Sequence, residues 1–445
     1  MTLGHGAFGK DRQALAVLRD GGRTRLLSLT RVLVVLLLVG GGAGHLRAQT
    51  PPQPGLTPGE EAALRQQIIA LYPTQLPEVP QPWFNPLDAV KVTLGEALFF
   101  DPNLSRCGTL ACASCHLPEQ GFASPYQVPP GCDGVGGRRR APALYNVAYQ
   151  GHYFWDGRVQ SLEQQALLPV VTPAEMGGVW DIVLTYLNTG RHIPTGKEYP
   201  QARAFYTAYF AEVFNSDITP VTVSRALAAY ERTILTRDAA FDRWLAGDDA
   251  ALTPAQKRGA ERFFGRANCA VCHPPPLFTD DKFHNIGTPQ GGFEIPHLFP
   301  ANTTIRAAAE AQGWSVPLDV DLGRQEVPPL QSSWTDLGAF KTPTLRNVAL
   351  HGPYMHNGAL ATLEEVMRHY EHLAASERQP LVGKLAFYVR YGKAHFGARG
   401  GGAADDVEVM MAFMQALTGT QRAARLERVQ PPRLNPQRSQ LPYRQ

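Results

Sequence analysis

The run Cys112-Ala113-Ser114-Cys115-His116 recurs later in the chain as Cys269-Ala270-Val271-Cys272-His273. Each copy has the spacing of a c-type haem attachment site, in which two thiols add to the haem vinyl groups and the adjacent histidine binds the iron. A structural zinc knuckle or a thioredoxin-like redox pair is the alternative. Zinc needs four ligands in closed geometry, whereas these pairs lie far apart in the sequence. The two runs therefore predict two covalently bound haem c groups.

The first 48 residues have the pattern of a secretory signal. Several arginines precede an apolar run at 32–39, and Ala48 offers a small residue for cleavage. The apolar run is shorter than the roughly 20 residues that span a bilayer. We therefore expect a periplasmic protein with no stable membrane insertion after cleavage, and an uncleaved anchor is the alternative.

Composition describes a soluble globular protein with room for two or three domains. The chain has 445 residues, of which 44% are hydrophobic and 18% charged, with a formal net charge of +3. Residues 1–48 carry seven basic and two acidic side chains, so the remainder has a formal charge of −2. The basic balance belongs to the signal, and no nucleic-acid partner is expected.

Two cysteines, Cys107 and Cys132, remain after the haem attachment sites are filled. An even remainder in an oxidising compartment is most simply a disulfide. The alternative is that Cys132 stands free beside the first haem.

The chain repeats itself beyond the haem motifs. Residues 142–164 align without gaps on residues 343–365, and ten of the 23 positions are identical. β-branched alternating runs are nearly absent, which favours helices over sheet. The expected fold is mainly α, with two cytochrome-c-like haem domains related by internal duplication and joined by long loops, one of them within 274–341.

The expected domain order is a signal peptide at 1–48, a first, peroxidatic haem domain at 49–245, a second, electron-transfer haem domain at 246–420 and a disordered tail at 421–445. Threonine–proline pairs predict three helix starts, at Thr57-Pro58, Thr219-Pro220 and Thr253-Pro254. The second of these helices is expected to run through Ile234. Further helices are expected at 90–100 and from Thr362.

Two longer stretches carry a family resemblance. Phe154-Trp155-Asp156-Gly157-Arg158 and Pro353-Tyr354-Met355-His356-Asn357-Gly358 resemble the bacterial di-haem cytochrome c peroxidase family, which includes MauG. The resemblance covers roughly residues 90–420. It implies that the haem of His116 is the peroxide site, with Glu175 as distal acid and base, Gln165 as its hydrogen-bonding neighbour and Trp155 as the bridge between the haems.

These roles also make chemical sense from the residue types alone. Peroxide cleavage needs a proton moved from one oxygen to the other, and a carboxyl group held over an open iron can do both steps. An indole between two haems is oxidisable. The structural alternatives are a surface carboxylate for Glu175 and core packing for Trp155.

The chain departs from the family pattern after the first haem motif. Many members place a histidine ligand at the position of Cys132, and no histidine occurs here between Leu117 and Gln150. We therefore expect the first haem to be open or water-bound and to need no reductive activation.

The second haem and the metal between the haems show further departures. Tyr370 falls where typical members have a methionine ligand, so His273 and Tyr370 are the expected axial pair, with Met367 as the alternative. The asparagine that contributes to the family's calcium site corresponds to Arg140. Backbone carbonyls near His351 and Pro353 could still serve, so calcium stays an open expectation.

The sequence thus favours a periplasmic di-haem c-type peroxidase that reduces hydrogen peroxide at the His116 haem, with electrons passing through the His273 haem. A small periplasmic electron-donor protein or a protein substrate would supply those electrons. The alternatives are a MauG-like oxidase that modifies residues of a partner protein, and a non-catalytic di-haem electron carrier.

Overall fold

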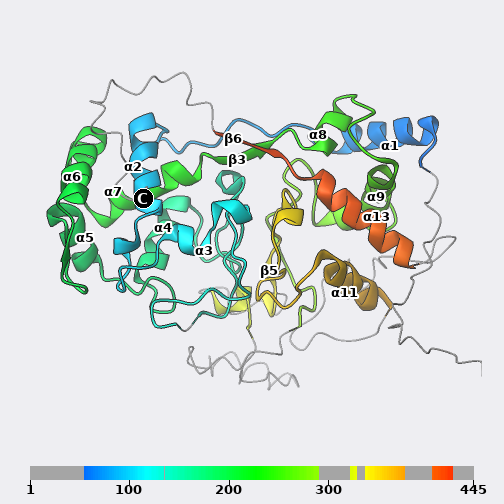
Figure 1. Ribbon diagram of the computed structural model, residues 1–445. Coiled ribbons are helices and arrows are strands. Elements are labelled where there is room, and N and C mark those ends of the chain that lie inside the picture. The colour runs from blue at the N-terminus through cyan, green and yellow to red at the C-terminus, as the bar shows by residue number, and fades with distance from the viewer. Residues whose placement is uncertain (1–54, 135, 290–320, 328–335, 376–402, 424–445) are drawn as a thin grey trace, which may run out of the picture. The chain divides into compact units, whose positions relative to one another are not determined.

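The computed structural model describes residues 55–134, 136–289, 321–327, 336–375 and 403–423. The fold is mainly helical, as predicted, with loops between the helices (Figure 1). The α-helices are α1 Pro58–Leu71, α2 Ala89–Phe99, α3 Cys112–Cys115, α4 Leu162–Val171, α5 Trp180–Thr189, α6 Pro200–Phe214, α7 Pro220–Glu231, α8 Ala240–Leu245, α9 Pro254–Phe264, α11 Leu363–Ala375 and α13 Ala403–Ala416.

The strands form three short antiparallel pairs. They are β1 Arg191–His192 with β2 Lys197–Glu198, β3 Ile234–Arg237 with β6 Thr420–Ala423, and β4 Phe283–His284 with β5 Phe340–Lys341. Within the described part of the chain, no helix is both long enough and apolar enough to cross a bilayer. The expected signal at 1–48 and much of the expected loop at 274–341 lie outside the described residues.

The three predicted threonine–proline helix starts are confirmed. Thr57, Thr219 and Thr253 are the N-caps of α1, α7 and α9, and each accepts a hydrogen bond from a backbone N–H of the first turn. This bond satisfies one of the donors that a helix start leaves open. Proline follows in each case, where its missing N–H costs nothing.

Two predictions near the β3–β6 pair are wrong. The helix that begins at Thr219 ends at Glu231, and Ile234 instead begins β3. The tail expected to be disordered from residue 421 enters β6, which continues to Ala423. Both segments form strands because their backbones pair with each other, with Ile234 opposite Ala423. Residues 424–445 lie outside the described part.

Buried side chains form two hydrophobic clusters. The first gathers residues of α2, α4, α5, α6 and α7, and the second gathers residues of α1, α8, α9, α11 and α13. Helices α1 and α8 precede residue 246, yet Ile68 and Trp244 lie in the second cluster. Packing therefore does not follow chain order throughout, and the domain boundaries stay a prediction.

The two clusters contain the same close helix crossing. A Cβ atom added to Gly95 of α2 would lie 1.9 Å from the carbonyl oxygen of Ala226 in α7. One added to Gly259 of α9 would lie 2.1 Å from the carbonyl oxygen of Val409 in α13. Glycine is needed at both points because the facing backbone leaves no room for a side chain.

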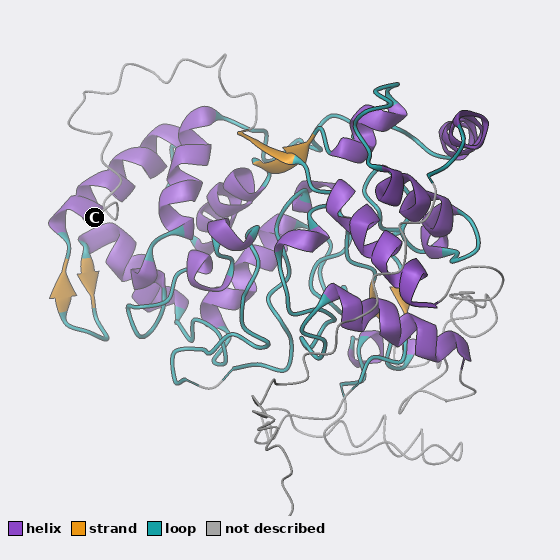
Figure 2. Ribbon diagram, turned by 45° about the vertical axis from the view of Figure 1, so that its right-hand side comes forward, coloured by secondary structure: helices purple, strands orange, loops and turns teal. Residues whose placement is uncertain are grey.

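The aligned segments 142–164 and 343–365 also attach to the fold in the same way. Asn146 and Asn347 both have left-handed backbone conformations, with φ of 60° and 62°. The Asn146 side-chain oxygen accepts the N–H of Thr236 at 3.1 Å, and that of Asn347 accepts the N–H of Gly419 at 3.0 Å. The two asparagines thus tie both segments to the same end of the β3–β6 ribbon, where Arg237 pairs with Thr420; this is one of the strand pairs drawn in orange in Figure 2.

Candidate haem sites

The first cysteine–histidine run lines a cavity in the first cluster. Cys112 and Cys115 begin and end the single turn of α3, which places both side chains on one side of that turn. Both are free thiols, and together with His116 they line this cavity, which we call the first cavity. The Nδ1 atom of His116 lies 2.9 Å from the carbonyl oxygen of Pro142. A carbonyl can only accept, so Nδ1 carries the proton and Nε2 is the nitrogen with a free lone pair.

The second run repeats this arrangement in another cavity, which we call the second cavity. Cys269 and Cys272 are free thiols and line it with His273. The Nδ1 atom of His273 lies 2.9 Å from the carbonyl oxygen of Phe278, which again leaves Nε2 as the ligand nitrogen. Burial lowers the pKa of His116 and of His273 to about 4, so both imidazoles are in the neutral form that binds a metal.

These donor sets fit haem c better than zinc. Cys272, Asp280 and His284 each place one ligand atom within 4.8 Å of the others. A structural zinc site takes four ligands, and no fourth joins this group among the residues that the structure describes. The Asp280 carboxylate instead lies 2.7 Å from Nε2 of His284. Each cavity thus offers two thiols, the neutral histidine that follows them and a largely apolar wall, as a covalently attached haem requires. His351 also lines the first cavity, and His284 and His356 also line the second.

All three predicted catalytic side chains line the first cavity. Gln165 comes from α4, Glu175 from the turn that follows α4, and Trp155 from the loop of the aligned segment. Burial raises the pKa of the Glu175 carboxyl group, and the charge of Arg158 opposes this shift. A carboxyl group whose pKa is raised can more readily give a proton as well as take one.

Two further side chains of the first cavity were not predicted. Met176 is buried beside Glu175, and Glu231 is buried at the end of α7. One side-chain oxygen of Glu231 has no hydrogen-bond partner, and burial raises its pKa to about 8. The sequence held one clue to Glu231, because it is an acidic residue within the otherwise apolar face of the helix that begins at Thr219.

Trp155 lines both cavities. Its Nε1–H donates to the carbonyl oxygen of Arg140 at 2.8 Å, and its own carbonyl oxygen accepts the N–H of Lys341 at 2.7 Å. The indole centroid lies 6.4 Å from the centroid of the His356 ring, at an interplanar angle of 69°. Trp155 therefore lies between the two cavities in which the haems are expected.

Arg140 brings a positive charge to the same region. Its guanidinium is buried and donates to the carbonyl oxygens of Ser124 at 2.5 Å and Gly352 at 3.2 Å. Gly352 lies between His351 and Pro353, near which backbone carbonyls could still serve a calcium ion. The Arg140 guanidinium places a fixed positive charge on one carbonyl oxygen of this stretch, and that charge disfavours a calcium ion beside it.

The candidate ligands on α11 separate into two groups. Met367 and Tyr370 line the second cavity, and burial raises the pKa of the Tyr370 hydroxyl. The Nε2 atom of His369 lies 2.9 Å from the carbonyl oxygen of Ile286, and Nδ1 of His372 lies 2.6 Å from that of Arg368. Two histidines are thereby bound to backbone, whereas Tyr370 and Met367 both stay candidates.

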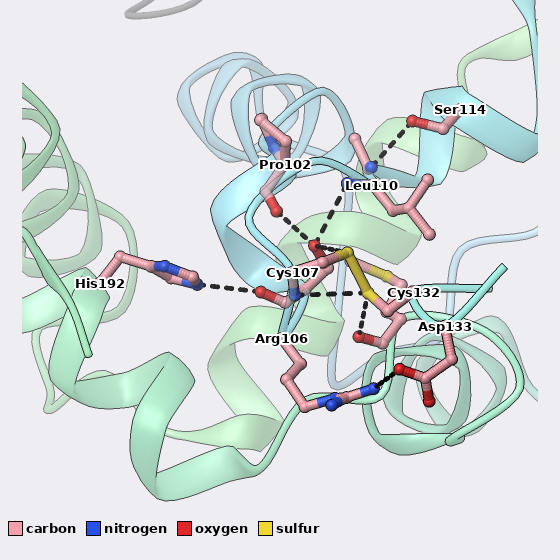
Figure 3. The surroundings of a disulfide bond; sticks show 11 residues. Pro102, Arg106, Cys107, Leu110, Ser114, Cys132, Asp133 and His192 are labelled. Carbon is pink, nitrogen blue, oxygen red and sulfur yellow. Dashed lines mark hydrogen bonds and ion pairs between the residues drawn. A yellow bond between two sulfur atoms is a disulfide. The ribbon is translucent and has the colours of Figure 1, made fainter. Parts of the chain in front are cut away.

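The predicted disulfide is confirmed. Cys107 and Cys132 are bonded, with their Cα atoms 5.5 Å apart (Figure 3). A free Cys132 beside the first haem is therefore excluded. The bond lies close to the turn that carries Glu175, since the backbone N–H of Cys132 donates to the carbonyl oxygen of Glu175 at 3.0 Å.

Comparisons with known proteins agree on one family. A family model described as di-haem cytochrome c peroxidase matches residues 89–250. The methylamine utilization protein MauG of Methylorubrum extorquens is 38% identical over 304 residues, which are 68% of this chain and 74% of that protein. The cytochrome-c peroxidase IdrP1 of Denitromonas iodatirespirans is 38% identical over 311 residues, 66% of this chain and 76% of the relative.

A solved structure gives the same result for the fold. The crystal structure of a MauG-like protein associated with microbial copper homeostasis superposes with a TM-score of 0.60 and 27% sequence identity. The match covers 78% of this chain and 96% of that protein. The similarity therefore extends well beyond the haem-binding motifs.

Proposed function

The chain belongs to the family of di-haem cytochrome c peroxidases that includes MauG, and from this we propose that it is a periplasmic di-haem peroxidase that reduces hydrogen peroxide. Membership makes it an oxidoreductase with peroxide as electron acceptor. The observation that carries the proposal is that Glu175 lines the cavity that also contains Cys112, Cys115 and His116.

Glu175 is the proton-transferring group of this proposal. Reduction of hydrogen peroxide consumes two electrons and two protons and yields two water molecules. Glu175 takes the proton of one peroxide oxygen and returns it to the other, so that the O–O bond breaks with water as the leaving group. The remaining oxygen atom takes up the two electrons, which would reach it from the electron donor by way of the haems, and two protons, and becomes the second water. The raised pKa of this carboxyl group supports such shuttling, because it favours the protonated form that returns the proton.

Two haem c groups are assigned to the two cavities, one held by Cys112, Cys115 and His116 and the other by Cys269, Cys272 and His273. When bound, they would supply the metal site for peroxide in the first cavity and an electron store in the second. Tyr370 is the proposed second ligand in the second cavity, since its buried hydroxyl lines that wall.

Gln165 and Trp155 complete the proposed site. The Gln165 amide can donate to or accept from peroxide and Glu175, because an amide has both functions. The Trp155 indole N–H donates to a carbonyl oxygen, which is too weak a base to remove its proton. Oxidised Trp155 therefore keeps this proton, and its charge can return to neutral by electron transfer alone.

The two halves are proposed to be copies of one haem domain. The two glycine crossings support this duplication: Gly95 of α2 packs against α7, and Gly259 of α9 packs against α13. The matching attachments of Asn146 and Asn347 support it independently. We retain domains at 49–245 and 246–420 after a signal peptide at 1–48, with α1 and α8 packing across that division.

The test is the replacement Glu175→Gln. The amide keeps the shape of the carboxyl group but cannot carry the proton, so the reaction of the ferric protein with peroxide should slow by about 10²- to 10⁴-fold. Stopped-flow absorption of both haems, without prior reduction, measures the rate. Glu119→Gln is the matched control, since Glu119 is exposed in the same half.

Haem absorption at rest confirms that both haems are attached in each variant. An unchanged rate in Glu175→Gln would defeat the assignment of the proton-transferring group. A wild-type protein that reacts only after partial reduction would contradict the expected open first site.

A second function is favoured by Tyr370 and by the 38% identity to MauG: oxidation of residues on a partner protein. A phenolate ligand would stabilise oxidised states of the second haem relative to methionine. Steady-state turnover of peroxide with a reduced small cytochrome c separates the two. Rapid turnover supports the peroxidase, and a single oxidation event without turnover supports the partner-modifying oxidase.

Met176 makes the electron-carrier alternative testable. Its buried side chain lines the first cavity, where a thioether could close the coordination of the iron. A ferric spectrum without a high-spin component, together with no reaction with peroxide, would favour a carrier over an enzyme.

A further inference from the structure

The disulfide joins two segments that contact the turn carrying Glu175. Cys107 follows Arg106, and the N–H of Arg106 donates to the carbonyl oxygen of Met176 at 2.9 Å. The N–H of Cys132 donates to the carbonyl oxygen of Glu175 at 3.0 Å. The Cys107–Cys132 bond thus connects two segments whose backbone N–H groups donate to the adjacent residues Glu175 and Met176.

These two hydrogen bonds are the long-range backbone anchors of that turn among the described residues. Its other backbone hydrogen bonds are local, such as those from the N–H groups of Glu175 and Gly177 to the carbonyl oxygen of Thr172. The bonds from the N–H groups of Met176 and Gly178 to the carbonyl oxygens of Pro169 and Val170 hold one side of the turn to α4, and the other side is held by the two segments that the disulfide joins. The position of the turn relative to the rest of the first cavity therefore depends partly on the segments that carry Cys107 and Cys132.

Close packing adds to the constraint. A Cβ atom placed on Gly131 would lie 2.4 Å from the carbonyl oxygen of Ala174 and 3.0 Å from that of Glu175. The segment before Cys132 therefore lies directly against the Glu175 turn. A movement of Cys132 would be passed to the turn by contact as well as by hydrogen bonding.

An ion pair also links the two segments but contributes less. Arg106 pairs with Asp133, and their side chains are 49% and 62% exposed. Exposed pairs of this kind contribute little because water and salt screen them. The covalent bond is the strong connection.

We propose that the Cys107–Cys132 disulfide is a positioning device that holds Glu175 at its working place over the first cavity. This inference rests on the proposed function. The alternative is a disulfide that only stabilises an exported protein. If the disulfide positions Glu175, its removal must slow the peroxide reaction through Glu175. If the disulfide only stabilises the fold, its removal need not change that reaction.

The experiment compares four holoproteins: wild type, Cys107→Ser/Cys132→Ser, Glu175→Gln and the triple variant. Removing the disulfide should slow the reaction of the ferric protein with peroxide by about 10²-fold, the size expected when a catalytic group is misplaced by about 1 Å. In the Glu175→Gln background the same change should have little effect, because the group to be positioned is gone.

A second readout is the pH profile of the peroxide reaction. A displaced Glu175 becomes more solvated, so its pKa falls and the acidic limb of the profile moves to lower pH. Asp133→Asn is the control, because it removes only the ion pair and should keep the wild-type rate and profile.

The outcomes separate the hypotheses. A lower melting temperature with unchanged peroxide kinetics would overturn the positioning role, and so would an equal loss of rate in both backgrounds. A wild-type rate in Glu175→Gln alone would instead refute the proposed function. If the double variant does not fold, phosphine reduction of the folded protein and alkylation of the two thiols replace it, since haem thioether bonds are not disulfides and resist that treatment.

Discussion

Glu231 shows how a single buried side chain can make stability depend on pH. It lies on the wall of the first cavity with one unpaired oxygen, and its pKa is raised to about 8 by burial. The neighbouring cation Arg232 is bound to Glu163, with Nη1 2.8 Å from Oε1, and so offers only partial compensation. Glu231 is therefore protonated in the folded protein at neutral pH.

The replacement Glu231→Gln should flatten the pH dependence of stability. The folded-state pKa of Glu231 lies above its unfolded value of 4.5, so the folded protein binds the extra proton between about pH 4.5 and 8. The wild type then loses about 1.4 kcal/mol of unfolding free energy per pH unit from this group as the pH rises through that window. Urea unfolding of holoprotein at pH 5 and pH 7 measures the slope, and parallel profiles for the two proteins would contradict the prediction.

The contacts of Arg140 lead us to predict that a chelator of divalent cations does not affect the stability of the protein. Its guanidinium is a permanent cation bound to the carbonyl oxygens of Ser124 and Gly352. Treatment of the wild type with EDTA should leave its melting temperature and haem absorption unchanged. A drop in melting temperature that added calcium reverses would refute this reading.

The variant Arg140→Asn should reverse this behaviour. It leaves two carbonyl oxygens without a donor, at about 1–3 kcal/mol for each buried group, and adds an amide oxygen of the kind that calcium binds. We expect a lower melting temperature that calcium partly restores. Arg140→Lys is the control, because it keeps the positive charge and should show no calcium effect.

At this scale, sequence predicted the residues whose chemistry depends on local spacing. The cysteine and histidine positions follow from five-residue runs, and the structure places all six around two cavities. The choice between Tyr370 and Met367 does not follow, because both side chains line the same wall. Met176 and Glu231 were missed because their relation to His116 exists only in three dimensions.

At the scale of elements, the crossing of α2 and α7 depends on one missing side chain. Gly95→Ala should destabilise the holoprotein by about 1–3 kcal/mol, because its Cβ atom would lie 1.9 Å from a backbone oxygen that cannot move alone. Gly59→Ala in α1 is the matched control, since nothing lies within 4 Å of its added Cβ. That change should stabilise by about 0.5–1 kcal/mol. Thermal melting measures both, and similar melting temperatures would disprove the steric argument.

Helix starts were predictable because each depends on neighbouring residues. The pairs Thr219-Pro220 and Thr253-Pro254 cap α7 and α9 as expected. The end of α7 was not predictable, since the β3 backbone finds its partner in β6, far along the chain. For the same reason the amphipathic pattern of α1 predicted a helix but not its packing in the second cluster.

At the scale of the whole described chain, the two aligned segments cross-connect. The N–H of Arg140 donates to the carbonyl oxygen of His356, and the N–H of Lys341 donates to that of Trp155, both at 2.7 Å. Each donor and acceptor pair is the counterpart of the other under the sequence repeat. The repeat predicted two similar units but could not orient them, because internal identity carries no information on which faces meet.

The first cavity is lined by residues of both halves of the chain, so the order in which the halves emerge affects how this cavity is completed. Tyr354 and Met355 help to enclose the first cavity, although they are synthesised long after Cys112 and Cys115. On the proposed export route, the first pair of thiols therefore enters the periplasm with that side of its cavity still missing, and we expect the first haem to enter there before the later half folds over it. The second pair of thiols emerges beside a first half that is already present. A failure to attach haem to the first half should therefore also prevent the second half from completing its fold.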